Sequence, residues 1–160
     1  SAAPALVSKE SPVPAGPESD ILESLRRISR ALDVFSHSLA ARFHLTVPQL
    51  VCLRALLDAP AQTPGQLARE VVLSQATVTG ILDRLEARGF IERRRDGLDR
   101  RRVLLYVTAA GRKAAALAPA SLHQRLAGNL VNLPLDERQR IADVLRQVAA
   151  MMEEAAPPPA

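Results

Sequence analysis

The segment 63–111 constrains the fold of this chain most strongly, because two short helices and a β-hairpin are predicted to follow one another within it. Thr63 can cap the first helix, Pro64 suits its first position, and Gln66 can complete a capping box. Ser74 is a second possible N-cap only a few residues after that helix ends. The two helices are therefore separated by a short turn.

The second of these helices is predicted for residues 74–88, and Gly89 ends it. Its apolar residues recur at spacings of three and four, at Val78, Ile81, Leu82 and Leu85. Two amphipathic helices joined in this way form a helix-turn-helix, whose second helix lies in the major groove of DNA. The residues expected to face DNA are Thr63, Ser74, Gln75, Ala76, Thr77, Thr79 and Arg84.

A hairpin, or wing, is predicted for residues 90–108, where the periodicity changes to two and Asp96-Gly97 marks a turn. Between positions 93 and 102 six arginines accompany two aspartates, so this segment carries a net charge of +4, equal to that of the whole chain. Such a concentration favours phosphate binding, and an arginine at a tip can enter a narrow minor groove. The expected DNA-binding residues of the wing are Arg93, Arg94, Arg95, Asp99, Arg100, Arg101 and Arg102.

The basic segment has a simpler interpretation, a charged loop that only aids solubility, since most charge runs do no more. Its position favours the interpretation as a nucleic-acid contact, because the arginines gather at a hairpin tip directly after a helix-turn-helix. A basic hairpin could also bind an acidic protein or RNA, and that alternative predicts no dependence on DNA sequence.

Long helices flank this region and carry apolar seams suited to pairing with a second copy of the chain. A first helix is predicted within 19–44, a second long helix from Ala109 to about Asn129, and a last one after Pro134. The alternative is that these helices only complete a monomeric core. We expect a two-fold homodimer with this seam: Ile21, Leu25, Ile28, Leu135, Ile141, Val144, Leu145 and Val148.

Five segments follow from these patterns: a disordered arm at 1–18, a dimerisation helix at 19–44, a DNA-binding region at 45–108, dimerisation helices at 109–154 and a disordered tail at 155–160. With 48% hydrophobic but only 2% aromatic residues, the core must consist of Leu, Val, Ile and Ala. No apolar run approaches the roughly 18 residues of a membrane span, and no leader resembles a signal peptide. A cytoplasmic location is expected, and the family resemblance described next adds that it is bacterial and at the nucleoid.

Several motifs together resemble the MarR family of bacterial winged-helix regulators, over roughly residues 20–153. They are Leu45-Thr46-x-x-Gln49, Leu67-Ala68, Ser74-x-x-Thr77-Val78-Thr79, Asp83-Arg84-Leu85-Glu86-x-x-Gly89, and Asp99-Arg100-Arg101 followed by Val103, Leu105, Val107, Thr108 and Gly111. The resemblance implies a mainly α fold with a small β-hairpin wing and flanking dimerisation helices. It also implies that Arg101 enters the minor groove and that Asp99 holds the arginines of the wing.

One departure from the family pattern concerns base recognition. Many members carry an arginine in the recognition helix where this chain has Gly80, so base selection is expected to rest on Gln75, Thr77 and Thr79. The run 74–86 also resembles a subgroup associated with osmotic-stress and ectoine-type genes.

Family members bind small aromatic or anionic effectors between the dimer helices and the DNA-reading lobe. Near the corresponding place lie Arg30, His37, His44 and Arg54, which form the candidate effector site, although surface histidines usually have no such role. Cys52, the only cysteine, could sense peroxide as in some similar regulators, but its place between Val51 and Leu53 favours a buried, inert thiol.

Catalysis finds no support in the sequence, because the histidines lack metal-ligand spacing and no nucleophile or phosphate-loop motif occurs. We therefore expect no enzyme, no metal and no cofactor. The expected function is sequence-specific binding of double-stranded DNA by a ligand-responsive homodimeric repressor that recognises a pseudo-palindromic operator. Redox sensing through Cys52 and a winged-helix module for a protein or RNA partner are the alternatives.

Overall fold

All described helices except α1 (Pro17–Phe43) and α7 (Leu135–Ala155) start at a threonine or serine whose hydroxyl accepts the backbone N–H three residues later. In the computed structural model, which describes residues 16–157, this holds for α2 (Val47–Asp58), α3 (Pro64–Glu70), α4 (Gln75–Ala87), α5 (Ala109–Leu117) and α6 (Leu122–Leu130). The caps are Thr46, Thr63, Ser74, Thr108 and Ser121. The predicted caps at 63, 74 and 108 are confirmed.

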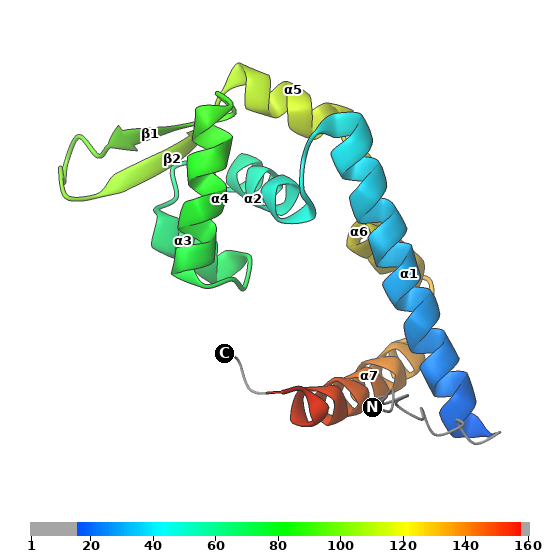
Figure 1. Ribbon diagram of the computed structural model, residues 1–160. Coiled ribbons are helices and arrows are strands. Elements are labelled where there is room, and N and C mark those ends of the chain that lie inside the picture. Colours follow the sequence, from blue (N-terminus) through cyan, green and yellow to red (C-terminus); the bar gives the residue numbers. More distant parts are fainter. Residues whose placement is uncertain (1–15, 158–160) are drawn as a thin grey trace, which may run out of the picture. The chain divides into compact units, whose positions relative to one another are not determined.

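The described residues form two compact units, one ending at Ala118 and the other beginning at Pro119. The first contains α1 (Pro17–Phe43), α2, α3, α4, the hairpin and α5, and Figure 1 shows the hairpin projecting beyond α3 and α4. The second contains α6 and α7 (Leu135–Ala155). No helix among residues 16–157 is long and apolar enough to cross a membrane.

The core of the first unit is aliphatic, and leucine is its commonest residue. The recognition-helix stripe Val78, Ile81, Leu82 and Leu85 is buried as the periodicity predicts. These residues pack in one cluster with residues from α1, α2, α3 and the hairpin, among them Leu39, Leu50, Leu53, Leu56, Leu67, Ile91 and Leu105. The predicted aliphatic core and the mainly α winged-helix fold are both confirmed.

The hairpin pairs β1 (Ile91–Arg95) with β2 (Val103–Val107) in antiparallel register, with Ile91 opposite Val107 and Arg95 opposite Val103. It is also tied to the turn before α3, because the N–H of Leu105 donates to the carbonyl of Gln62 at 2.8 Å. The wing is therefore an ordered extension of the helical core and not a loose loop.

The long helix predicted from Ala109 to about Asn129 is wrong, because the chain is broken between α5 and α6. Ala118 is extended, with φ −69° and ψ 142°, as expected for a residue that precedes proline. Ser121 then starts α6 with a capping box that includes Gln124. Pro119 thus ends one helix before the next begins.

The terminal boundaries also differ from those predicted. Residues 1–15 and 158–160 lie outside the described part of the chain, but Pro17 and Glu18, assigned to the disordered arm, begin α1. Pro17 suits the first turn of a helix, and the acidic side chains of Glu18 and Asp20 suit its positive end. At the other end Ala155 is the last residue of α7 and not part of a tail.

The turn inside the helix-turn-helix contains a strained residue. Val72 has φ 56°, in the left-handed region that β-branched residues rarely adopt. It follows α3 in a Schellman motif, in which the N–H of Leu73 donates to Ala68 O and that of Val72 to Arg69 O. The same motif ends α4, but there Gly89, with φ 72°, takes the strained position.

We therefore expect Val72→Gly to raise the free energy of unfolding by about 0.5–1 kcal/mol, because glycine relieves the left-handed strain while losing more freedom on folding. Val72 is 87% exposed, so little packing is lost with its side chain. Urea unfolding followed by circular dichroism measures the change. Gly89→Ala is the matched control and should have the opposite sign. A Val72→Gly protein no more stable than the wild type would refute the strain.

Candidate nucleic-acid interface

The exposed start of α4 is organised by its own hydroxyl groups. Ser74 Oγ accepts from Thr77 N at 3.1 Å and lies 2.7 Å from Thr77 Oγ1, while Thr79 Oγ1 donates to Gln75 O at 2.9 Å. The side chains of Gln75 and Ala76 are exposed, and within the described residues the Gln75 amide has no hydrogen-bond partner. Among the residues predicted to select bases, Gln75 is therefore the one whose donors and acceptor are all uncommitted.

The other predicted contacts on the helix-turn-helix have different surroundings. Thr63 Oγ1 accepts from Gln66 N at 3.2 Å, and the Gln66 side chain accepts from Thr63 N at 2.9 Å. The hydroxyl of Thr63 therefore caps α3. Arg84 is exposed further along α4. Thr63 thus has a clear structural role besides any DNA contact.

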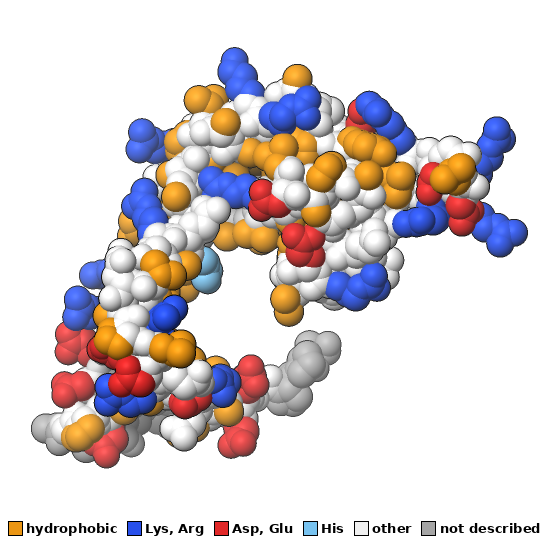
Figure 2. All heavy atoms as spheres, turned by 180° about the vertical axis from the view of Figure 1, so that it is seen from behind, with side chains coloured by type: hydrophobic (Ala, Val, Ile, Leu, Met, Phe, Trp, Pro, Cys, Tyr) orange, Lys and Arg blue, Asp and Glu red, His pale blue; other side chains and the backbone are white. Residues whose placement is uncertain are grey.

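Basic side chains gather around the projecting end of the hairpin, with acidic side chains among them (Figure 2). The six arginines of the wing nevertheless differ in what they contact. The side chains of four of them interact within the wing or with α4, and the side chains of two do not. This division separates arginines that hold the wing in shape from arginines that remain available to a ligand.

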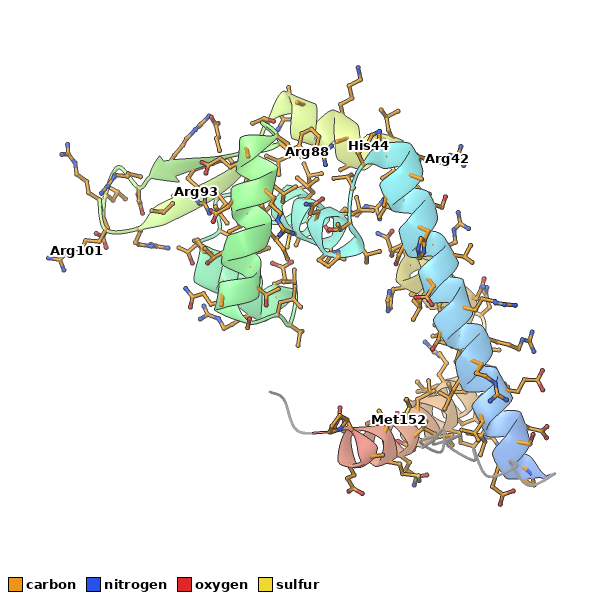
Figure 3. The ribbon with its side chains drawn as sticks, viewed as in Figure 1. Arg42, His44, Arg88, Arg93, Arg101 and Met152 are labelled. Carbon is orange, nitrogen blue, oxygen red and sulfur yellow. The ribbon has the colours of Figure 1, made fainter. Side chains whose placement is uncertain are left out.

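Arg93 joins the wing to the recognition helix (Figure 3). Its Nη2 lies 2.7 Å from Asp83 Oδ1, its Nη1 donates to Glu86, and its side chain is only 25% exposed. Partial burial opposes the charged form, but the hydrogen bonds to Asp83 and Glu86 outweigh it and raise the pKa of Arg93. The guanidinium of Arg93, predicted to bind phosphate, is therefore already paired with two carboxylates in this structure.

Three further arginines make contacts within the hairpin. Arg94 stacks 4.8 Å from the centre of the Tyr106 ring and pairs with Glu92. Arg95 Nη1 donates to Arg100 O at 3.2 Å, and Arg102 Nη1 lies 3.7 Å from Asp96 Oδ2. The side chains of Arg94 and Arg102 are half or more exposed, and that of Arg95 is exposed and bonds the loop backbone. All three stabilise the tip and keep positive charge at its surface.

Asp99, expected to hold the arginines of the wing, contacts one of them through its backbone and not through its guanidinium. Asp99 Oδ1 accepts from the backbone N–H of Arg101 at 3.0 Å, so it shapes the loop and pairs with no guanidinium among the described residues. The acid that pairs with an arginine is Asp96, which also accepts from Leu98 N at 3.0 Å. Aspartate suits both places because its short side chain reaches the backbone two residues ahead.

Arg100 and Arg101 have exposed side chains without a hydrogen bond or ion pair in the part of the chain that the structure describes. Figure 3 shows Arg101 at the far end of the wing. Besides the exposed Arg84 on α4, the interface therefore has two uncommitted parts, the Gln75 amide at the start of α4 and two guanidinium groups at the tip. Arg93, together with Asp83 and Glu86, fixes one part relative to the other.

The structure does not bring the four predicted effector residues together. A hollow of about 340 Å³ is lined by Ser36, His37, Ala40, Thr46, Val47 and Pro48, and so includes only His37 of the set. His44 instead ends α1, where its carbonyl accepts from Arg88, whose guanidinium lies 4.5 Å from the Phe90 ring centre (Figure 3). Arg54 donates to Ala118 O at 3.3 Å, and Arg30 is exposed on α1.

Cys52 is fully buried in α2, and desolvation raises the pKa of its thiol to about 11. The thiol therefore stays protonated at neutral pH and is a poor nucleophile. We expect an aromatic disulfide reagent to label Cys52 rapidly only when urea unfolds the chain. Peroxide should leave DNA binding unchanged in the wild type and in Cys52→Ser alike. A peroxide-dependent loss of binding that Cys52→Ser removes would contradict this assignment.

Asp83, Glu86 and Asp96 were not among the predicted site residues. Asp83 and Glu86 are three residues apart on α4, a spacing that places two carboxylates on one helix face, and this was the available signal. No comparable pattern marked Asp96, because only the folded loop brings it to Arg102.

Two capped helices, a buried stripe on the second of them and a braced basic hairpin define a winged helix-turn-helix. The sequence pattern of the MarR family matches residues 45–103. The HTH-type transcriptional regulator TtmR of Methylorubrum extorquens is 32% identical over 117 residues, which span 73% of this chain and 57% of TtmR. This match thus extends over little more than half the length of that relative.

Other similarities extend over nearly the whole of the related proteins. An uncharacterized HTH-type transcriptional regulator of Mycobacterium bovis is 30% identical, over 84% of this chain and 88% of that protein. The repressor CouR, solved with a 23-mer DNA duplex, is 29% identical over 87% of this chain and 99% of its own, with a TM-score of 0.62. PcaV of Streptomyces coelicolor, solved with its natural ligand, is 27% identical over 79% and 89%, with a TM-score of 0.60.

The chain belongs to the MarR family of winged-helix transcriptional regulators.

Proposed function

We propose that this protein is a homodimeric repressor that binds a pseudo-palindromic DNA operator and releases it when a small molecule binds. The observation that carries the proposal is the fixed pairing of recognition helix and wing through Arg93, which holds an uncommitted Gln75 and two uncommitted arginines on one rigid body. This arrangement allows the recognition helix to contact bases in the major groove while the wing contacts the adjacent minor groove. CouR, a similar protein, is a repressor that was solved bound to DNA.

The division of the interface sets the roles within this proposal. Gln75 selects a base, because a glutamine amide can both donate and accept on an adenine edge. Arg101 enters the minor groove, and Arg100 supplies phosphate affinity. Arg94, Arg95 and Arg102 add positive charge while shaping the wing, and Thr77 and Thr79 contribute mainly through the acceptor capacity left by their own hydrogen bonds.

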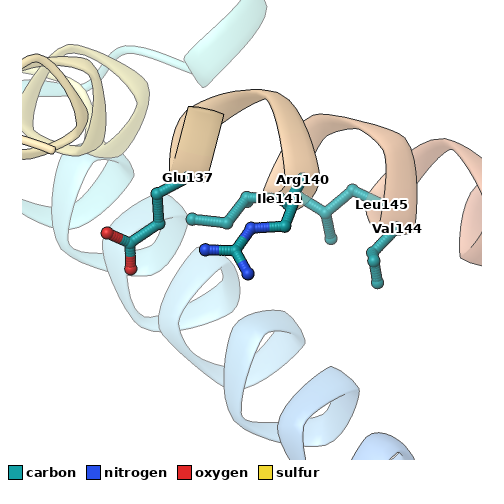
Figure 4. Close-up of a pocket in the computed structure, with 5 residues that line it drawn as sticks. All are labelled: Glu137, Arg140, Ile141, Val144 and Leu145. Atoms are coloured by element: carbon teal, nitrogen blue, oxygen red, sulfur yellow. The ribbon is translucent and has the colours of Figure 1, made fainter. Parts of the chain in front are cut away.

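The dimer rests on apolar side chains that the single chain leaves exposed. On α1 Ile21 and Ile28 are 49% and 50% exposed, and on α7 Leu135 and Val144 are 72% and 56% exposed. On α7, Ile141, Val144 and Leu145 also line an open hollow of about 470 Å³ with Glu137 and Arg140 (Figure 4). Exposed apolar residues in such number favour a partner surface, and two-fold pairing would place the recognition helices about 34 Å apart.

An effector would act by favouring a different spacing of the two recognition helices. The hollow beside His37 is the candidate entry point, because it lies where α1 ends and α2 begins. PcaV, a similar regulator, was solved with a natural ligand. Allosteric couplings of this kind are typically about 1–3 kcal/mol, so release could be partial. Action on operator DNA would place the protein in the bacterial cytoplasm, at the nucleoid.

Two single variants test the proposed roles. Gln75→Ala is expected to remove the preference at one base step in each half-site, at a cost of about 1–3 kcal/mol there, because it deletes the uncommitted amide. Arg101→Ala should weaken binding most where the flanks are rich in A·T, because the minor groove is narrow there. Fluorescence anisotropy on duplexes with single-step substitutions measures both, and equal losses on every duplex for both variants would overturn the roles.

A further inference from the structure

Leu98 is an apolar side chain at the very tip of a basic wing. It is 99% exposed, more than any other large apolar residue among residues 16–157. A single exposed leucine is ordinary on a protein surface, so its exposure alone has no functional meaning. Its meaning here depends on how its backbone is held and on what surrounds it.

The backbone around Leu98 is held by hydrogen bonds on both sides. The N–H of Leu98 donates to Asp96 Oδ1 at 3.0 Å, and that of Arg101 donates to Asp99 Oδ1 at 3.0 Å. The loop is closed by bonds from Asp96 N to Arg102 O at 3.0 Å and from Arg102 N to Asp99 O at 2.9 Å. These bonds fix the path of the backbone, so Leu98 is exposed on an ordered loop.

The neighbours of Leu98 at the tip are positively charged. Arg100 and Arg101 follow it within three residues, and their guanidinium groups have no hydrogen bond or ion pair in the described chain. Arg95 adds a further guanidinium that holds the Arg100 carbonyl at 3.2 Å. An apolar side chain surrounded by unpaired arginines does not suit an apolar protein surface as its partner. It suits a polyanion that also has an apolar interior.

The DNA minor groove has this combination of properties. Its phosphates and narrow A·T tracts attract arginine, and its base stack admits apolar wedges such as leucine, which partly unstack a step and bend the duplex. We propose that Leu98 is such a wedge: it enters the minor groove beside Arg101 and unstacks a flexible pyrimidine–purine step in each flank of the operator. This inference rests on the proposed DNA-binding function and adds a sequence preference at steps that no polar group reads.

The test uses a duplex selected by the wild-type protein from a random-sequence pool, with 2-aminopurine in the flanking steps and a dye pair at its ends. Binding of the wild type is expected to raise 2-aminopurine fluorescence and to bring the ends closer. Leu98→Ala should lose both signals and bind DNA about 5- to 20-fold more weakly. The variant loses the apolar contact of one buried leucine side chain, and the base stacking it regains offsets only part of that loss. Leu98→Met should keep them, since methionine is also an apolar wedge.

The controls separate the possible failures. Leu117→Ala removes another exposed leucine, 63% exposed at the end of α5, and should change neither signal. The unfolding temperature of Leu98→Ala should match that of the wild type, because the fully exposed side chain contributes no packing to the folded chain. A Leu98→Ala protein that bends and unstacks the duplex as the wild type does overturns the wedge alone. A wild-type protein that selects no duplex over shuffled DNA defeats the proposed function and the wedge together.

Discussion

We expect Gly111→Ala to lower the free energy of unfolding by about 3 kcal/mol or more, because a Cβ at this position meets backbone that cannot move away. That Cβ would lie 2.0 Å from the carbonyl oxygen of Phe90 and 2.8 Å from Val107 Cγ1. The carbonyl is fixed by the N–H of Thr108 at 3.0 Å, and Thr108 Oγ1 also donates to Gly89 O at 2.6 Å. Urea unfolding followed by circular dichroism measures the loss.

Gly80→Ala provides the matched control for Gly111→Ala in the same unit. A Cβ on Gly80 meets nothing within 4 Å, and the residue lies inside α4. The same chemical change should therefore stabilise the fold there, by up to about 1 kcal/mol, because alanine is the better helix former. Equal effects of the two substitutions would show that the close approach of α5 to the end of α4 is not as tight as the structure has it.

The second large effect is expected from Val144→Asp, which should convert the proposed dimer to monomers. Val144 is 56% exposed in the single chain, so the substitution does not disrupt the unit itself. In a two-fold dimer each protomer would bury one new carboxylate in the interface. Each uncompensated buried charge destabilises the dimer by about 3–5 kcal/mol. We therefore expect dimer dissociation to be favoured by at least about 100-fold, which sedimentation velocity across a concentration series detects.

Ala150→Asp adds the same charge six residues further along α7, about 120° around the helix from Val144, and should leave the sedimentation of the protein unchanged. The two variants should differ in the same way in DNA binding, because a monomer engages one half-site only. A Val144→Asp protein that remains dimeric would show that the exposed face of α7 is not the pairing surface.

Much of the fold could be predicted because its determinants are local. Thr63 and Gln66, or Ser74 alone, cap helices through bonds to residues three positions away, and such patterns can be found in the sequence. The change to a period of two after Phe90 likewise marks the hairpin. Pro119 is a local signal of the same kind, because proline ends a helix, but the apolar spacing over 109–129 favoured one continuous helix instead.

The site was less predictable, because its side-chain roles depend on proximity between elements. Counting charges made all six arginines of the wing equivalent, yet Arg93 reaches back ten residues to Asp83 on another element. The ion pair of Asp96 with Arg102 and the bond of Asp99 to the backbone of Arg101 likewise depend on how the folded loop turns each side chain. For the same reason Arg54 contacts Ala118 and does not join His37.

The binding of the purified protein to DNA upstream of its own gene, compared with a shuffled duplex, tests the central claim most directly. Fluorescence anisotropy across a salt series gives both affinity and its salt dependence. We expect the native duplex to bind at least about 1,000-fold more tightly, with log affinity falling by about 0.9 per phosphate contact for each unit of log salt. Equal and weak binding of both duplexes would contradict a sequence-specific regulator and leave the wing a general anion-binding surface.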